Sequence, residues 1–140
     1  MRLFRLGVDL FIAAICAGLV AGFMTGFLFV IVSMGLAAFF APVTWFAALM
    51  GSAYALVFAS PVALLLGALL WSLRLRHWLI WACAGALTGL GYFFFMWQTP
   101  GNQLTPATIP LAAVQLASGA CTALVFRLVM RTLRANTDDI

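Results

Sequence analysis

No charged side chain interrupts residues 10–41, which read LFIAAICAGLVAGFMTGFLFVIVSMGLAAFFA. The apolar core of a secretory signal peptide is only about 7–15 residues long, so this run is roughly twice too long to be one. At about 1.5 Å per residue, a helix of this length exceeds a hydrocarbon core of about 30 Å. The run therefore predicts a membrane-spanning helix over residues 8–40 that tilts in the bilayer or projects from it.

The composition of the whole chain supports a membrane environment. The 140 residues are 66% apolar and 7% charged, whereas a soluble domain has roughly 45–50% apolar and about 25% charged residues. Because so few charges cannot cover a water-exposed surface, lipid must be the solvent for most of the protein. Nucleic acid is not expected as a partner, since the basic residues stand at the ends of apolar runs rather than on a common face.

Three further apolar runs follow the first. They predict helices over residues 45–73, 78–97 and 109–134, so we expect one all-α transmembrane domain over residues 1–140, built as two antiparallel hairpins. A Pro-containing turn near Pro42 separates the first two helices. The second and third are joined by a very short polar connection. An uncharged segment rich in Pro, from Gln98 to Pro110, forms a loop before the fourth.

The arginines predict the orientation. All seven basic residues are Arg, and they lie before the first helix, between the second and third, and around the end of the fourth. With four spans, these places share one side of the membrane. The positive-inside rule assigns that side to the cytoplasm. We therefore expect a multi-pass protein of a cell inner membrane with both termini cytoplasmic. Aromatic residues near the helix ends, among them Trp71, Trp78 and Trp81, are expected to anchor the helices in the head-group region.

Small residues recur at four-residue steps on each predicted helix. In lipid, such stripes permit the close backbone approach through which helices associate. They can be used inside a four-helix bundle, or one of them can face another subunit. The first helix is the candidate for an outward-facing stripe because its glycine repeat is the strongest. The candidate packing and partner-interface residues are Gly18, Gly22, Gly26, Gly51, Ala55, Ala59, Gly85 and Gly89, with Ala113, Ala117 and Cys121 as the stripe of the fourth helix.

Catalytic chemistry is not indicated. The predicted spans have no ionisable residue at mid-bilayer depth, and the sequence has no Glu and no paired carboxylates for acid–base work. Asp9 is expected to pair with Arg5 at the inner interface, and His77 to be a solvated residue of the inner turn, although a functional role of either stays open. The three cysteines have no metal-site spacing. We expect no enzyme activity, no cofactor and no metal.

Two other groups of residues remain as candidates. Gln115, Ser118 and Thr122 lie on one face of the fourth helix, where they either form interhelical hydrogen bonds or line a polar solute path. Five arginines are expected to contact anionic lipid head groups: Arg74, Arg76, Arg127, Arg131 and Arg134.

These features favour a non-catalytic accessory or scaffold subunit of a multi-subunit inner-membrane complex. The alternative is a small homo-oligomeric channel or transporter for a small solute. The partners expected are the lipid bilayer, including its anionic lipids, and other membrane subunits or further copies of this chain.

Overall fold

Helices make up the whole of the regular structure that the computed structural model describes, which covers residues 2–75, 77–97 and 108–138. The elements are α1 (Arg2–Met34), the short 3-10 helix η1 (Leu36–Phe40), α2 (Pro42–Ser72), α3 (Trp78–Trp97) and α4 (Ile109–Asp138). Four of these described helices are long and apolar enough to cross a membrane. The predicted all-α, multi-pass membrane fold is confirmed in that form. Of the loop predicted from Gln98 to Pro110, residues 98–107 lie outside the described residues, and Ile109 and Pro110 form the start of α4.

The first long helix ends earlier than its apolar run. Gly35 has a φ of 85°, in a region that side-chain-bearing residues rarely adopt, and it separates α1 from η1. The Gly35 N–H still donates to the Ile31 carbonyl at 2.8 Å, and the Gly35 carbonyl accepts from the Ala38 N–H at 3.0 Å. Hydropathy alone does not reveal this break, because the residues on both sides of Gly35 are apolar. α2 then begins at Pro42, whose missing N–H costs nothing in a first turn.

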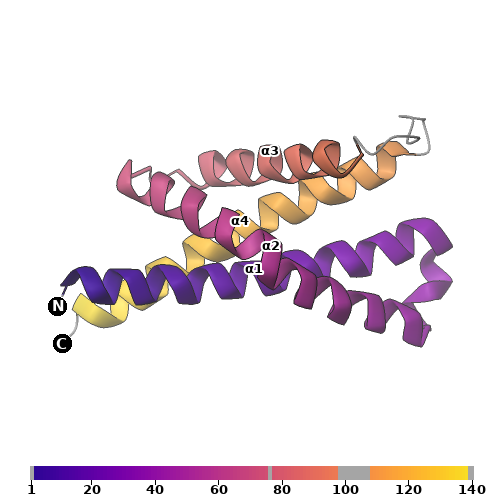
Figure 1. Cartoon of the computed structure of the whole chain (residues 1–140), viewed down its shortest axis with the longest axis horizontal. Helices are drawn as coiled ribbons and strands as arrows, with labels where there is room; N and C mark the ends of the chain where they lie inside the picture. Colours follow the sequence, from indigo (N-terminus) through magenta and orange to yellow (C-terminus); the bar gives the residue numbers. More distant parts are fainter. Residues whose placement is uncertain (1, 76, 98–107, 139–140) are drawn as a thin grey trace.

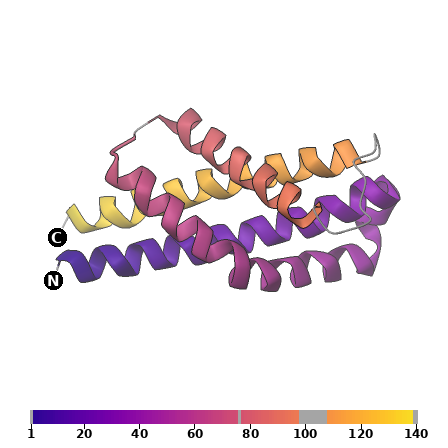
Figure 2. The ribbon, with the colours of Figure 1, turned by 45° about the horizontal axis from the view of Figure 1, so that its top comes forward.

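The four long helices are not packed as a closed ring. α1 lies along α2 and also along α4, and α3 lies along α4. Over the described residues, α2 and α3 share no comparable contact, although only a short turn separates them in sequence. Figures 1 and 2 show the two chain termini at the same end of the molecule, with the α2–α3 turn also toward that end.

Glycines bring α1 and α2 together. A Cβ placed on Gly22 would overlap the carbonyl oxygen of Gly51, and one on Gly26 would overlap the carbonyl of Ala47. A Cβ on Gly18 would overlap the hydroxyl of Ser60. The glycine stripe of α1 is therefore filled by α2 of the same chain, and it does not face outward as the candidate partner surface would require.

A second glycine seam joins α3 to α4. Gly85 lies against the carbonyl of Gly119, Gly89 lies against the carbonyl of Gln115, and a Cβ on Gly119 would in turn overlap the carbonyl of Gly85. This seam does not use the expected stripe of the fourth helix, because Ala113 and Ala117 are exposed. The four-residue pattern alone could not distinguish the two faces of α4, since small residues occur on both.

The buried core lies in the half of the molecule that contains the termini. It consists of small residues of α1 and large residues of the other three helices: Ala13, Ala14, Ala17, Leu70, Trp81, Phe126 and Met130. The Trp81 ring stacks on Phe126 with centroids 6.0 Å apart. Its indole N–H donates to the Leu75 carbonyl at 2.8 Å. Trp81 is only 1% exposed, so its predicted role as an interfacial anchor is replaced by a role in the core.

Candidate functional site

A groove follows the gap between α2 and α3. α1 and α4 also contribute residues to its wall, because these two helices pack against each other, α1 packs along α2, and α4 packs along α3. Its volume is about 410 Å³. Since α2 and α3 do not pack along each other, the groove is a direct consequence of how the four helices are paired.

Most of the groove wall is apolar, and small side chains line much of it. Ala55, Ala59 and Ala63 of α2 line it at consecutive four-residue steps, so they lie on one face of the helix. Phe58 and Val62 stand beside them and are 53% and 46% exposed. Small residues allow another backbone to approach closely in lipid. Ala55 and Ala59, predicted as packing residues, therefore face the groove.

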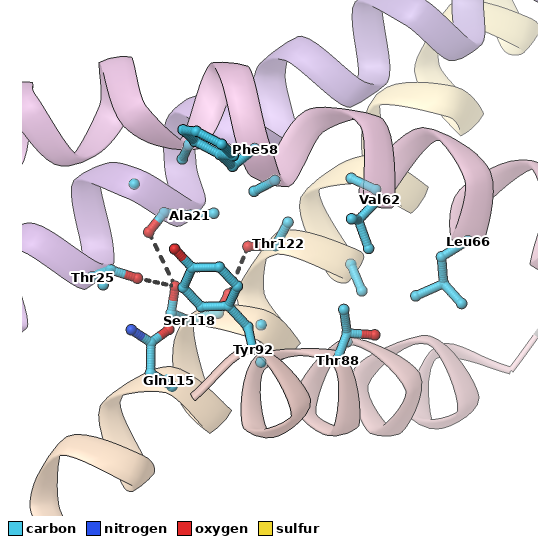
Figure 3. A pocket seen from close by; sticks show the side chains of 18 of the residues that line it. Ala21, Thr25, Phe58, Val62, Leu66, Thr88, Tyr92, Gln115, Ser118 and Thr122 are labelled. Atoms are coloured by element: carbon cyan, nitrogen blue, oxygen red, sulfur yellow. Dashed lines mark hydrogen bonds between the residues drawn. The ribbon is translucent and has the colours of Figure 1, made fainter. Parts of the chain in front are cut away.

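Hydroxyl groups at one end of the groove are hydrogen-bonded within the bundle (Figure 3). Ser118 of α4 is buried, lies 2.8 Å from the Thr25 hydroxyl, and donates to the Ala21 carbonyl of α1 at 3.0 Å. Thr122 donates to the Ser118 carbonyl at 2.7 Å. The two contacts of Ser118 tie α4 to α1, which is the interhelical role expected for Ser118, whereas the Thr122 bond lies within α4. They also leave little of this polar face available to a passing solute.

Gln115 and Tyr92 lie at the same end of the groove. Both side chains are drawn beside Ser118 in Figure 3, and Gln115 comes from α4 whereas Tyr92 comes from α3. The Tyr92 side chain interacts with that of Tyr54 on α2, whose ring packs at a tilt of 31° against the Phe58 ring with centroids 4.4 Å apart. The tyrosine pair is thus a side-chain link across the groove between helices that otherwise stay apart.

A second cavity, of about 660 Å³, lies at the other end of α2 and α4. Four of the five arginines predicted to contact head groups line it, namely Arg74, Arg127, Arg131 and Arg134. Arg76 lies outside the described residues. The sequence placed these arginines on one side of the membrane, but it could not show that the α2–α3 turn brings Arg74 to the arginine face of α4.

Catalytic or metal-binding groups do not gather elsewhere in the described part of the chain. It contains no group of three His, Cys, Asp or Glu side chains that could hold a metal ion. Asp9 is half-buried and His77 is exposed. The cysteines are free thiols on three different helices, with Cys83 exposed and Cys16 and Cys121 half-buried.

Known proteins give no further assignment. Comparison of the chain with protein-family models, with curated protein sequences and with solved structures finds no match. The groove and the arginine-lined cavity are therefore the features from which a function is inferred.

Proposed function

We propose that the chain is a non-catalytic accessory subunit of an inner-membrane assembly and that the α2–α3 groove receives a transmembrane helix of a partner subunit. The observation that carries the proposal is the groove itself. Two neighbouring helices remain apart, and the wall between them is lined by alanines at helical spacing. A helix that docked there would complete the packing of α2 and α3.

The shape of the groove favours a helix over a polar solute. Helices in lipid associate by van der Waals packing against small residues, and Ala55, Ala59 and Ala63 provide such a surface. The hydroxyls of Ser118 and Thr122 already have partners inside the bundle. Because these hydroxyls are already paired, the Gln115 amide is the main polar group for which docking of an apolar segment would carry a desolvation cost.

The proposed assembly requires a defined orientation. We propose that α1–α2 and α3–α4 are antiparallel hairpins with both termini in the cytoplasm, as the arginine distribution indicates. The positions of Arg74, Arg127, Arg131 and Arg134 around one cavity, at the end of the molecule where both termini lie, support this orientation. The Tyr54–Tyr92 pair then belongs to the half of the groove nearer the outer side.

A second candidate is a small homo-oligomeric channel or transporter. Gln115 and Thr88 line the groove, and their side chains offer polar groups at membrane depth. For this function, Gln115→Ala should change solute flux in liposomes without changing the mass of the assembly. Unchanged flux would remove the support that Gln115 gives to this candidate.

Native mass spectrometry of nanodisc-extracted protein tests the docking proposal with two matched variants. Ala59→Trp fills the groove, whereas Leu65→Trp adds the same side chain at a lipid-facing position that is 70% exposed and does not line the groove. We expect the wild type and Leu65→Trp to retain a second protein at fixed stoichiometry, and Ala59→Trp to lose it while keeping its thermal stability. Retention by both variants, or a homo-oligomer alone in the wild type, would contradict the proposal.

A further inference from the structure

The arginine-lined cavity concentrates positive charge between two helix ends. Arg127, Arg131 and Arg134 follow one another on α4 at steps of four and three residues, so they share a face. Arg74 enters the same cavity from the turn after α2. Among the residues that the structure describes, no acidic side chain lines the cavity. Because like charges at this spacing repel one another, an anion bound beside Arg74, Arg131 and Arg134 would lower the repulsion among them.

The backbone at Arg74 supports a role for its guanidinium group. Arg74 has a φ of 52°, the one positive φ at a non-glycine residue in the described part of the chain. Its N–H bonds to the Trp71 carbonyl at 3.0 Å, and the Leu75 N–H bonds to the Leu70 carbonyl at 3.4 Å. This is the hydrogen-bond pattern of a Schellman motif, whose left-handed position is usually occupied by Gly. In that position Arg is less favourable for the backbone than Gly. The guanidinium group, which Gly lacks, is therefore the feature that Arg74 contributes there.

Two tryptophans form part of the cavity wall. Trp71 and Trp81 contribute to its wall with ring centroids 6.5 Å apart. The Arg134 guanidinium carbon lies 5.0 Å from the centre of the Trp71 ring, within the range of a cation–π interaction. This contact fixes the orientation of a guanidinium group whose side chain could otherwise adopt several conformations in water. Trp81 also lines the apolar groove, so one core side chain borders both this cavity and the groove.

We propose that this cavity is a binding site for the head group of one anionic phospholipid bearing two phosphodiester groups. Guanidinium groups bind phosphate oxygens through paired, charge-assisted hydrogen bonds. Four arginines suit two phosphates better than a single one. Basic pockets between helix ends on the cytoplasmic side are suited to head groups of this kind. The acyl chains of the lipid would extend past the partly exposed Trp71 into the bilayer.

Three variants separate a built site from general attraction to a negative membrane. Arg131→Gln removes a guanidinium from the cavity, whereas Arg5→Gln removes the same charge from an exposed position that does not line it. Arg74→Gly removes a cavity charge while relaxing the backbone. Lipid retention is measured by native mass spectrometry of delipidated protein titrated with cardiolipin, phosphatidylglycerol or phosphatidylcholine.

We expect cardiolipin to be retained in preference to phosphatidylglycerol at equal phosphate concentration. Arg131→Gln and Arg74→Gly should each weaken cardiolipin binding about tenfold, and Arg5→Gln should leave it within about twofold. Arg74→Gly should also unfold at the same temperature as the wild type or higher, which separates loss of binding from loss of fold. Equal effects of Arg131→Gln and Arg5→Gln would overturn the proposal.

A soluble phosphate compound is the other source of the same chemistry. Inorganic pyrophosphate, added to the protein in lipid-free detergent, should not raise the unfolding temperature at millimolar concentration and should not displace cardiolipin. Saturable pyrophosphate binding that Arg131→Gln abolishes would overturn the lipid assignment in favour of a soluble anion.

Discussion

Gly22→Ala perturbs the seam between α1 and α2 at its closest point. The added Cβ would overlap the Gly51 carbonyl oxygen and lie 2.5 Å from the Ser52 Cα. Both are backbone atoms, so no flexible side chain can move aside. α1 and α2 would have to separate locally. The stability of the fold itself would therefore fall before any association with a partner was affected.

The expected cost follows from the contacts that the separation disturbs. Forcing an extra carbon into a well-packed interface costs about 1–3 kcal/mol. The Ser52 hydroxyl bridges the seam to the Leu19 carbonyl at 3.3 Å, and weakening this bond adds about 0.5 kcal/mol. We therefore expect Gly22→Ala to lower the free energy of unfolding by about 1.5–3.5 kcal/mol.

Gly7→Ala is the matched control on the same helix. No atom lies within 4 Å of the Cβ that this change would add, and Ala favours a helix over Gly by up to about 1 kcal/mol. Gly7→Ala should therefore be neutral or slightly stabilising. The assay is reversible unfolding in mixed micelles by SDS titration, followed by tryptophan fluorescence. Equal midpoints for the two variants would refute the reasoning that glycines of α1 hold α2 within the chain.

Other substitutions test single contacts. Ser118→Ala removes the bonds to Thr25 and Ala21 and should lower the unfolding free energy by about 1 kcal/mol in the same SDS titration. The mass of the assembly should not change, and a loss of assembly would instead place Ser118 at an interface. Trp81→Ala empties a core position that is 1% exposed and should cost about 3–5 kcal/mol by chemical denaturation, whereas Trp78→Ala, at a position 54% exposed, should cost less than about 1 kcal/mol. Tyr92→Phe removes a hydroxyl that faces Tyr54 and should increase spin-label distances between α2 and α3, with unchanged distances between α3 and α4 as the control.

Much of the architecture could be predicted from hydropathy and from the positions of helix-breaking residues. Long uncharged runs and a proline turn indicate the number and order of the helices, because a bilayer demands both length and apolarity. The break at Gly35 was not predicted, since the apolar residues Met34 and Leu36 on either side of this glycine hide it. Hydropathy indicates whether a segment lies in lipid or in water, whereas this break depends on the φ angle of Gly35.

The helix pairing decided which site residues could be predicted. Gly22 and Gly85 were correctly chosen as residues of close approach, but the sequence does not state which helix approaches them. The groove arises because α2 and α3 do not pack along each other. The local sequence pattern of a helix cannot show that such a contact is absent. Arg74 was assigned to the lipid surface, and only the turn geometry shows that it joins Arg131 around one cavity.

The central claim is that the α2–α3 groove holds a helix of another protein. Its most direct test is photocrosslinking in native membranes from a benzophenone side chain placed at Val62, which lines the groove, and at Leu65, which does not. We expect Val62 to form a crosslink that peptide mapping assigns to one apolar segment of a second membrane protein, and Leu65 to form none. Crosslinks from Val62 to lipid alone, or to another copy of this chain, would contradict the claim.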